Sequence, residues 1–434
     1  MKAFIRNTIT KIIELEAKLV LRKYRPKIIA ITGSVGKTGT KDAVFAVLGE
    51  ALVARKSVKS FNSEIGLPLT ILNCENAWSN PFLWIKNIFV GLTLWLTRVH
   101  YPKWLVLEIG ADKPGDIAHA TSWVHPDVAI ITRFGEVPVH VQFFKSPEEV
   151  FEEKANLAKA LRPTGMLILN ADDERVLALK DRTKAKVITY GTNSSAMFRA
   201  TNIQIMYVRS HQAHKVPTGM TFKLEYDGNV FPVVMNGVIG EQSVYSALAA
   251  LATGVYLKLN IIDMIDRLSK YQSPAGRMRL IPGIKGTMII DDTYNSSPVA
   301  AMAAVTALSH IDTNGKRILV LGDMLELGKF TMDEHIKLGT LVGSFADVLI
   351  AVGPRAKYII QGAIENDMSE KNIMEFDDSR LAGKYLETII NDGDVILVKG
   401  SQGVRMERAV EEIMAHPEEA EHVLVRQDEE WKKR

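Results

Sequence analysis

The chain has 434 residues, more than one ordinary domain holds, so two or three domains are expected. Hydrophobic residues make up 47% and charged residues 24%, a composition that excludes a disordered protein. The formal net charge of +3 gives no general case for a nucleic-acid-binding protein. The single cysteine, Cys74, excludes an intramolecular disulfide and a zinc site built from cysteines.

Residues 1–26 carry a basic amphipathic pattern. Ile9, Ile12 and Ile13 belong to an apolar set at helical spacing, and Pro26 ends the pattern. One interpretation is a helix packed on the following domain, and the other is a helix lying on an anionic membrane surface. The segment has no continuous apolar core like that of a signal peptide. We therefore expect a cytoplasmic protein, peripheral at the inner face of the membrane if the second interpretation holds.

A short apolar strand at residues 27–32 runs into a glycine-bearing turn and then a Lys-Thr pair that opens a helix. The glycines let the backbone N–H groups point at a phosphate. The lysine supplies a cation for the β- and γ-phosphates, and the threonine hydroxyl suits Mg²⁺. This pattern predicts a nucleotide site, although Ile31 stands where the usual motif has its first glycine. The residues expected in the phosphate loop are Gly33, Ser34, Val35, Gly36, Lys37, Thr38 and Gly39.

Strand-like and helix-like segments alternate after this loop. Residues 104–110, 128–135 and 166–173 are short β-rich runs, and residues 147–161 have a helical pattern. This alternation predicts a parallel, doubly wound sheet, whose chemistry gathers at the carboxyl ends of the strands. Four polar residues are expected at that edge: Glu108, Thr132, Asn170 and Asp172.

Residues 78–104 form an aromatic insert that holds four of the six tryptophans. Its most apolar part, residues 82–96, is interrupted by Lys86 and Asn87 and is too short to span a membrane. Tryptophan, phenylalanine and leucine beside basic residues suit a membrane interface. They suit equally well a helix docked on a partner or on the protein itself, so both interpretations stay open.

The pattern changes beyond residue 200. Residues 201–238 suggest antiparallel strands, residues 241–257 a helix, and residues 273–279 a hinge into a second α/β unit. A solvated acidic tail is expected at the end of the chain. The predicted division is a basic helix at 1–26, a central ATP-binding domain at 27–272 and a C-terminal domain at 273–434.

Six motifs follow one another in a familiar order: TGSVGKT, FNSEIGLPLTIL, LEIGADKPGDI, IIDDTYNSSPVAM, LVLGDMLELG and LVKGSQGVRMERAV. Together they resemble the Mur ligase family, in particular its branch that adds D-Ala-D-Ala to a UDP-muramoyl tripeptide. The resemblance covers residues 28–410. It implies an α/β protein: a P-loop central domain with a parallel doubly wound sheet, and a C-terminal Rossmann-like α/β domain.

The resemblance also implies a reaction, in which ATP converts a substrate carboxylate to an acyl phosphate and an amine then displaces the phosphate. The implied cofactors are ATP and Mg²⁺. Lys37 would hold the phosphates, while Thr38 and Glu108 would hold Mg²⁺. His140 would help to bind a second Mg²⁺, and Lys154 would be carbamylated and so become an anionic metal ligand. Lys37, His140 and Lys154 are therefore the candidate catalytic residues.

Further residues follow from the same resemblance. Arg277 would reach the nucleotide phosphates when the domains close. The residues implied at the adenosine are Asp292, Tyr294 and Asn295. The residues implied at the substrates are Asn62, Glu64, Lys399 and Arg405, the last two near the carboxylate of the incoming amine. The partners implied are small molecules, namely D-Ala-D-Ala and a nucleotide- or lipid-linked muramoyl peptide, and a monomer is expected.

The sequence departs from the family pattern at three places. Only 32 residues precede Gly33, so the separate domain that grips the UDP group is expected to be absent. The family's GxHNxxN segment, whose asparagine contacts adenine, reads GEQSVYS at residues 240–246, and Gly39 replaces a threonine or serine. Two alternatives therefore remain: a ligase like folylpolyglutamate or poly-γ-glutamate synthases with a non-muramoyl acceptor, and a non-catalytic nucleotide-binding scaffold for cell-wall enzymes.

Overall fold

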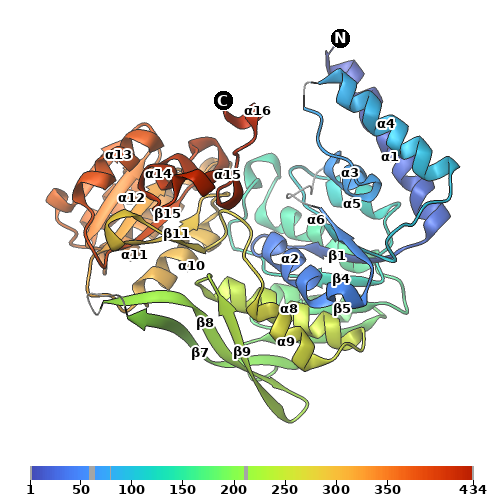
Figure 1. Cartoon of the computed structure of the whole chain (residues 1–434), viewed down its shortest axis with the longest axis horizontal. Helices are drawn as coiled ribbons and strands as arrows, with labels where there is room; N and C mark the ends of the chain where they lie inside the picture. Colours follow the sequence, from blue (N-terminus) through green and yellow to red (C-terminus); the bar gives the residue numbers. More distant parts are fainter. Residues whose placement is uncertain (1, 58–63, 79, 210–213, 433–434) are drawn as a thin grey trace.

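A computed structural model describes residues 2–57, 64–78, 80–209 and 214–432. Its strands form two sheets, which lie side by side in Figure 1. The nine-stranded sheet has the order β2-β3-β1-β4-β5-β6-β7-β8-β9, and the six-stranded sheet has the order β10-β11-β15-β12-β13-β14. The predicted boundary between the domains at residues 272 and 273 falls between the last strand of the first sheet and the first strand of the second, and it stays a prediction.

The first sheet is parallel from β2 to β7 and antiparallel from β7 to β9. The antiparallel strands predicted after residue 200 therefore extend the parallel sheet instead of forming a sheet of their own. The strands are β1 (Lys27–Thr32), β2 (Ala54–Lys56), β3 (Trp104–Glu108), β4 (Val128–Ile131), β5 (Met166–Asn170), β6 (Lys186–Gly191), β7 (Phe198–Arg209), β8 (Lys215–Tyr226) and β9 (Asn229–Asn236).

The central strands are buried on both faces, as expected for a parallel sheet covered by helices. Alternate residues of β1 show this directly, since successive side chains of a strand point to opposite faces. Ile29 and Ile31 belong to a core that includes α2 and α8, whereas Ile28 and Ala30 belong to a core that includes α1, α3 and α6. The doubly wound architecture predicted from the sequence is confirmed.

Sixteen α-helices accompany these strands in the described ranges. Those before the second sheet are α1 (Lys2–Tyr24), α2 (Lys37–Leu48), α3 (Gly66–Leu72), α4 (Pro81–Leu96), α5 (Asp116–Thr121), α6 (Pro147–Lys159), α7 (Glu174–Leu177), α8 (Glu241–Tyr256) and α9 (Ile261–Ser269). Those that follow are α10 (Pro298–Ser309), α11 (Thr331–Gly343), α12 (Lys357–Glu365), α13 (Ser379–Ile389), α14 (Glu407–Ile413), α15 (Ala420–Val423) and α16 (Glu429–Lys432).

The N-terminal helix α1 packs on α3 and on α4, the helix of the aromatic insert, beside the first sheet (Figure 1). Its buried face is formed by Ile13, Ala17 and Val20, whereas Ile12 is 37% exposed. The interpretation of residues 1–26 as a helix packed on the following domain is therefore confirmed. No helix in the described part of the chain is long and apolar enough to cross a membrane, as predicted for residues 82–96.

The second sheet is parallel except for its edge strand β10, which runs antiparallel to β11. Its strands are β10 (Arg279–Pro282), β11 (Met288–Asp292), β12 (Arg317–Gly322), β13 (Val348–Val352), β14 (Ile373–Phe376) and β15 (Val395–Lys399). Strands β11 and β15 are neighbours, so Asp292 and Lys399 lie in register at the carboxyl edge of this sheet.

Candidate functional site

The phosphate loop joins β1 to α2 and is held in place by the segment after β4. The backbone at Gly33 and Gly36 has φ values of +144° and +86°, which side chains rarely allow. A Cβ atom at Gly33 would lie 1.9 Å from Oγ1 of Thr132. The amide of Ser34 donates to the Arg133 carbonyl at 2.7 Å, and Thr132 Oγ1 donates to the Val35 carbonyl at 2.7 Å. Positions 33 and 36 therefore favour glycine strongly, and the hydrogen bonds to the segment after β4 hold the loop as a rigid turn.

Lys37 and Thr38 open α2 beside Glu108, the last residue of β3. Lys37 Nζ donates to the Gly33 carbonyl at 2.9 Å, and Thr38 Oγ1 donates to Glu108 Oε2 at 3.0 Å. Burial lowers the pKa of Lys37, and the charge of Glu108 only partly opposes this. A buried cation with so little compensation is suited to an anionic ligand. A hydroxyl and a carboxylate are hard oxygen ligands of the kind that Mg²⁺ prefers, and the predicted metal-binding role of Thr38 and Glu108 stays a prediction.

Lys154 lies on the buried face of α6, although its acidic neighbours in the sequence, Glu152 and Glu153, suggest an exposed side chain. Its side chain is buried and donates from Nζ to Ser34 Oγ at 2.9 Å. Burial, reinforced by the charge of Lys37, holds the pKa of Lys154 well below its ordinary value. Glu153 accepts hydrogen bonds from three backbone amides at the start of α5. Lys154 is therefore directed at the phosphate loop, and its neutral form is easier to reach than that of an exposed lysine.

His140 lies between the two halves of the protein. Its Nδ1 is 2.5 Å from Oε2 of Glu326, in the segment after β12, and its Nε2 is 3.5 Å from Oδ1 of Asp112. The hydrogen bond to His140 lowers the pKa of Glu326. Within the described ranges, no three histidine, cysteine or acidic side chains are grouped so as to hold a metal ion. The metal-binding roles of His140 and Lys154 therefore stay predictions.

Arg277 brings the second half of the chain to the phosphate loop. Its Nη2 donates to Thr38 Oγ1 at 3.2 Å, and its guanidinium carbon lies 4.0 Å from the centre of the Tyr294 ring. Arg277 Nε and Gln242 Oε1 are buried and have no hydrogen-bond partner among the described residues. Both line a cavity that includes Gly36, Gly39 and Ser243. An unpaired donor and an unpaired acceptor there fit the phosphates and the base of a nucleotide.

Two residue sets predicted for different tasks meet at the edge of the second sheet. Lys399 Nζ lies 2.5 Å from Oδ2 of Asp292 and donates to the Asn295 carbonyl at 3.0 Å. Lys399 is buried, so this ion pair is shielded from water. Asp292, predicted at the adenosine, thus already neutralises Lys399, predicted at the amine substrate.

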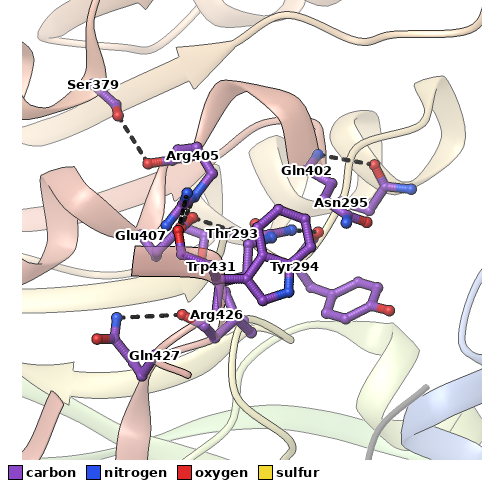
Figure 2. Close-up of polar contacts among 12 residues, drawn as sticks. Thr293, Tyr294, Asn295, Ser379, Gln402, Arg405, Glu407, Arg426, Gln427 and Trp431 are labelled. Carbon is purple, nitrogen blue, oxygen red and sulfur yellow. Dashed lines mark hydrogen bonds and ion pairs between the residues drawn. The ribbon is translucent and has the colours of Figure 1, made fainter. Parts of the chain in front are cut away.

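Arg405 belongs to a cluster that the sequence did not reveal, shown in Figure 2. Its Nε lies 2.5 Å from Glu407 Oε1, and its Nη1 donates to the Trp431 carbonyl at 2.9 Å. Glu407 Oε2 accepts from Nη1 of Arg426 at 2.9 Å, and the Arg426 side chain is only 5% exposed. Arg426 lies between the two stretches that were expected to be solvated, residues 417–422 and 427–434, and its side chain is buried against Glu407 and the carbonyls of residues 293 and 294.

The remaining predicted positions lie on the first half of the chain. Glu64 lines a cavity of about 230 Å³ together with Ile109, Lys113 and Trp123, whereas Asn62 lies outside the described residues. A Cβ atom at Gly39 would be 3.1 Å from Oγ of Ser246. The glycine at this position therefore allows α2 to approach α8 closely.

Two family models match this chain. The Mur ligase middle domain matches residues 86–254, and the Mur ligase glutamate ligase domain matches residues 276–402. The UDP-N-acetylmuramoyl-tripeptide–D-alanyl-D-alanine ligase of Bacillus subtilis is 28% identical over 414 residues, which are 95% of this chain and 81% of that protein.

The fold matches solved structures of the same kind. The MurF ligase of Thermotoga maritima, solved in complex with ADP, has a TM-score of 0.75 and 26% identity, covering 93% of this chain and 83% of that one. MurF from Acinetobacter baumannii has a TM-score of 0.74 and 25% identity, covering 92% and 79%. This chain belongs to the Mur ligase family and is an ATP-dependent ligase that forms carbon–nitrogen bonds.

Proposed function

We propose that this chain joins a carboxylate of a muramoyl tripeptide to the amino group of D-Ala-D-Ala, the reaction for which its relatives are named. The observation that carries the proposal is the contact between Arg277 and Thr38. It places a cation from the second half of the chain on the phosphate loop of the first half. A site completed from both halves suits a reaction that must hold ATP, an acid and an amine together.

The chemistry has two steps. A carboxylate oxygen of the acceptor attacks the γ-phosphorus of ATP, the bond to the bridging oxygen breaks, and ADP leaves. The amine nitrogen then attacks the acyl carbon, phosphate leaves with the bonding electron pair, and the nitrogen loses a proton to give the amide. Lys37, Arg277 and the loop amides would hold the transferred phosphate, because such transfer needs positioning and charge neutralisation above all. Mg²⁺ bound by Thr38 and Glu108 would neutralise phosphate charge.

Lys154 is suited to carbamylation. Only a neutral amine attacks CO₂, forming a nitrogen–carbon bond and losing a proton, and the lowered pKa of Lys154 favours that neutral form. The carbamate would present an anionic oxygen where the amine now meets Ser34. That change would turn an amine, which carries no negative charge, into an anionic oxygen ligand of the kind that Mg²⁺ prefers. His140 is the other residue that would help to bind this Mg²⁺.

ADP release with Mg²⁺-ATP tests the proposal, with the product followed by mass. UDP-muramoyl tripeptide and D-Ala-D-Ala are supplied together and separately. We expect release to need both and the product to be the pentapeptide. Ligation of glutamate to another acceptor would instead favour the folylpolyglutamate or poly-γ-glutamate type of ligase. Turnover only with a lipid-linked muramoyl peptide would keep the reaction and change the acceptor.

A second proposal concerns location: α1 and α4 place the enzyme on an anionic membrane surface. Phe82, Phe89 and Leu96 are 79%, 64% and 69% exposed, and their seven-residue spacing puts them on one face of α4. Lys86 and Arg98 are exposed on or beside the same helix. An apolar stripe next to basic residues suits a lipid interface, where a lipid-linked acceptor would also be found.

Cosedimentation with vesicles tests this location. We expect binding to phosphatidylglycerol vesicles, weaker binding to phosphatidylcholine vesicles, and loss of binding in the double variant Phe82→Asp/Phe89→Asp. Leu381→Asp is the matched control, because Leu381 is 56% exposed on α13. Equal sedimentation of the double variant and the wild type would contradict the proposal. Both halves of the site come from one chain, which supports a monomer, and sedimentation velocity checks this.

A further inference from the structure

We propose that Arg426 is a specificity residue for the amine substrate: it shares Glu407 with Arg405, and so leaves the pair of arginines with one positive charge for the carboxylate of that substrate. This inference rests on the proposed function and on the position near the amine substrate that the family resemblance implies for Arg405. It assigns a part in substrate recognition to the segment after residue 424.

The charge balance of the cluster carries the argument. One carboxylate, Glu407, accepts from two guanidinium groups, with Oε1 2.5 Å from Arg405 Nε and Oε2 2.9 Å from Arg426 Nη1. The exposed fractions of the three side chains are 10% for Arg405, 1% for Glu407 and 5% for Arg426. Two positive charges against one negative charge leave a net charge of +1, shielded from water. A buried excess charge of this kind favours binding of an anion.

Besides Glu407, the hydrogen-bond partners of Arg426 among the described residues are uncharged. Arg426 donates to the carbonyls of Thr293 and Tyr294, which carry no net charge (Figure 2). The nearby carboxylate of Asp292, the last residue of β11, is paired with Lys399 at 2.5 Å. Burial lowers the pKa of Arg426, Glu407 opposes this, and the charge of Arg405 adds to the lowering. The two guanidinium groups therefore still repel each other across their shared counter-ion.

Arg405 also keeps donors for a ligand. Its Nε and Nη1 bind Glu407 and the Trp431 carbonyl, while its Nη2 donates to no residue that the structure describes. A guanidinium with one edge fixed and the other edge available can hold a carboxylate in a defined orientation.

Trp431 covers this guanidinium. The centre of its ring lies 5.4 Å from the guanidinium carbon of Arg405 and 5.7 Å from that of Arg426. The edge of the same ring system meets Trp78, which precedes α4, with ring centres 6.0 Å apart and an interplanar angle of 89°. The last turn of the chain thus lies between Arg405 and the first half of the protein, where it would form one wall of the amine pocket.

The test compares acids with their carboxamides as amine substrates. D-Ala-D-Ala, D-Ala and L-Glu are each offered with the corresponding amide, for the wild type, Arg426→Gln and Arg426→Lys. We expect the wild type to prefer the acid. Arg426→Gln should raise KM for the acid about tenfold, leave KM for the amide and for ATP unchanged, and so remove the preference, because Glu407 then neutralises Arg405 fully. Arg426→Lys should restore the preference.

Arg380→Gln is the matched control, since Arg380 is a half-exposed arginine on α13 that pairs with Glu411 and Glu412. A purely structural role for Arg426 would lower turnover of acid and amide alike, and this result would overturn the inference. Ligation of an amine other than D-Ala-D-Ala would contradict the proposed function. The inference about Arg426 would still be decided by the ratio of KM for that acid to KM for its amide.

If the wild type ligates none of these amines, calorimetric titration of the ATP-loaded protein decides the inference separately. Tighter binding of D-Ala-D-Ala than of its amide, lost in Arg426→Gln, would support it. Equal binding of acid and amide to the wild type would overturn it.

Discussion

The phosphate loop and the Arg405 cluster both bury cations, but they treat the charge in opposite ways. In the loop, burial lowers the pKa of Lys37 and Glu108 compensates only in part. In the cluster, Glu407 takes hydrogen bonds from two arginines, and the backbone carbonyls of Trp431, Thr293 and Tyr294 each accept one more. The loop is built from a few consecutive residues. The cluster is assembled from segments that lie more than a hundred residues apart.

The phosphate loop therefore holds a positive charge that the protein compensates only in part, whereas in the Arg405 cluster Glu407 already compensates one of the two positive charges. ATP brings several negative charges, so a loop that receives it can leave its lysine uncompensated. The amine substrate of the proposed reaction brings one carboxylate, which the single excess positive charge proposed for the cluster would match. The same distinction predicts opposite effects on stability when a charged side chain is removed from each region.

The largest effect is expected for Lys37→Ala. ADP release should fall by about a thousandfold or more, because Lys37 would bear directly on the transferred phosphate. The midpoint of thermal unfolding should stay the same or rise, since a poorly compensated buried cation is removed. Steady-state ADP release and calorimetry check this, with Lys184→Ala at an exposed lysine as the control. If the Lys37→Ala variant kept its activity, the role given to Lys37 in the phosphate loop would be wrong.

Glu407→Ala should have the opposite signature. It leaves two buried guanidinium groups without their carboxylate, so we expect a loss of about 3 kcal/mol in the free energy of unfolding. Urea unfolding measures this loss. Glu421→Ala, which removes an exposed partner of Lys432, should leave the midpoint unchanged. A Glu407 variant as stable as the wild type would show that the cluster is not held by charge.

Lys154→Ala tests the carbamate proposal. We expect ADP release to fall by about a hundredfold, because an anionic metal ligand is lost. Formate or acetate should restore part of the activity by placing a carboxylate in the space left by the side chain. Wild-type activity should also fall when bicarbonate is removed and recover when it is returned. A variant with full activity, or a wild type indifferent to bicarbonate, would contradict the proposal.

The smallest effect concerns a third buried ionisable group, Glu16, which lies on α1 against Gly91 of α4, with neither oxygen paired to a described residue. Burial raises its pKa to about 7 from an ordinary 4.5. Between these values the folded state holds the proton more tightly than the unfolded chain, so the wild type loses stability as pH rises through this window. Glu16→Gln cannot titrate, and at pH 8 it should be more stable than the wild type by about 2 kcal/mol.

Thermal unfolding from pH 4 to 8 measures this difference, which should vanish at the acid end. Glu14→Gln is the matched control of opposite sign. Although burial raises the pKa of Glu14, its hydrogen bonds to Lys18 and His119 outweigh that and lower it. That carboxylate therefore stabilises the fold above its ordinary pKa, and its replacement should destabilise the protein at neutral pH. Parallel stability curves for the Glu16 variant and the wild type would contradict the prediction.

Local signals in the sequence were enough for the fold and for the phosphate loop. Glycine placement marks the turn at Gly33 and Gly36, and runs of apolar residues mark the buried strands. The surroundings of Lys154 and Arg426 are set by distant segments: the charged neighbours of Lys154 in the sequence suggested an exposed side chain, and no local pattern pointed to Arg426. The pairing of Asp292 with Lys399 depends on the register of β11 against β15, which no local pattern contains.

Helix α6 links two loops through adjacent residues. Glu153 receives the amides that begin α5, and Lys154 reaches Ser34 in the phosphate loop. A helix turns by about 100° per residue, so inserting one residue between Pro147 and Glu153 would swing both side chains away from these partners. Helix α6 therefore fixes the distance between the phosphate loop and the start of α5, which lines the cavity near Glu64. A change in the number of residues in the first part of α6 should therefore disturb the start of α5 and the phosphate loop at the same time.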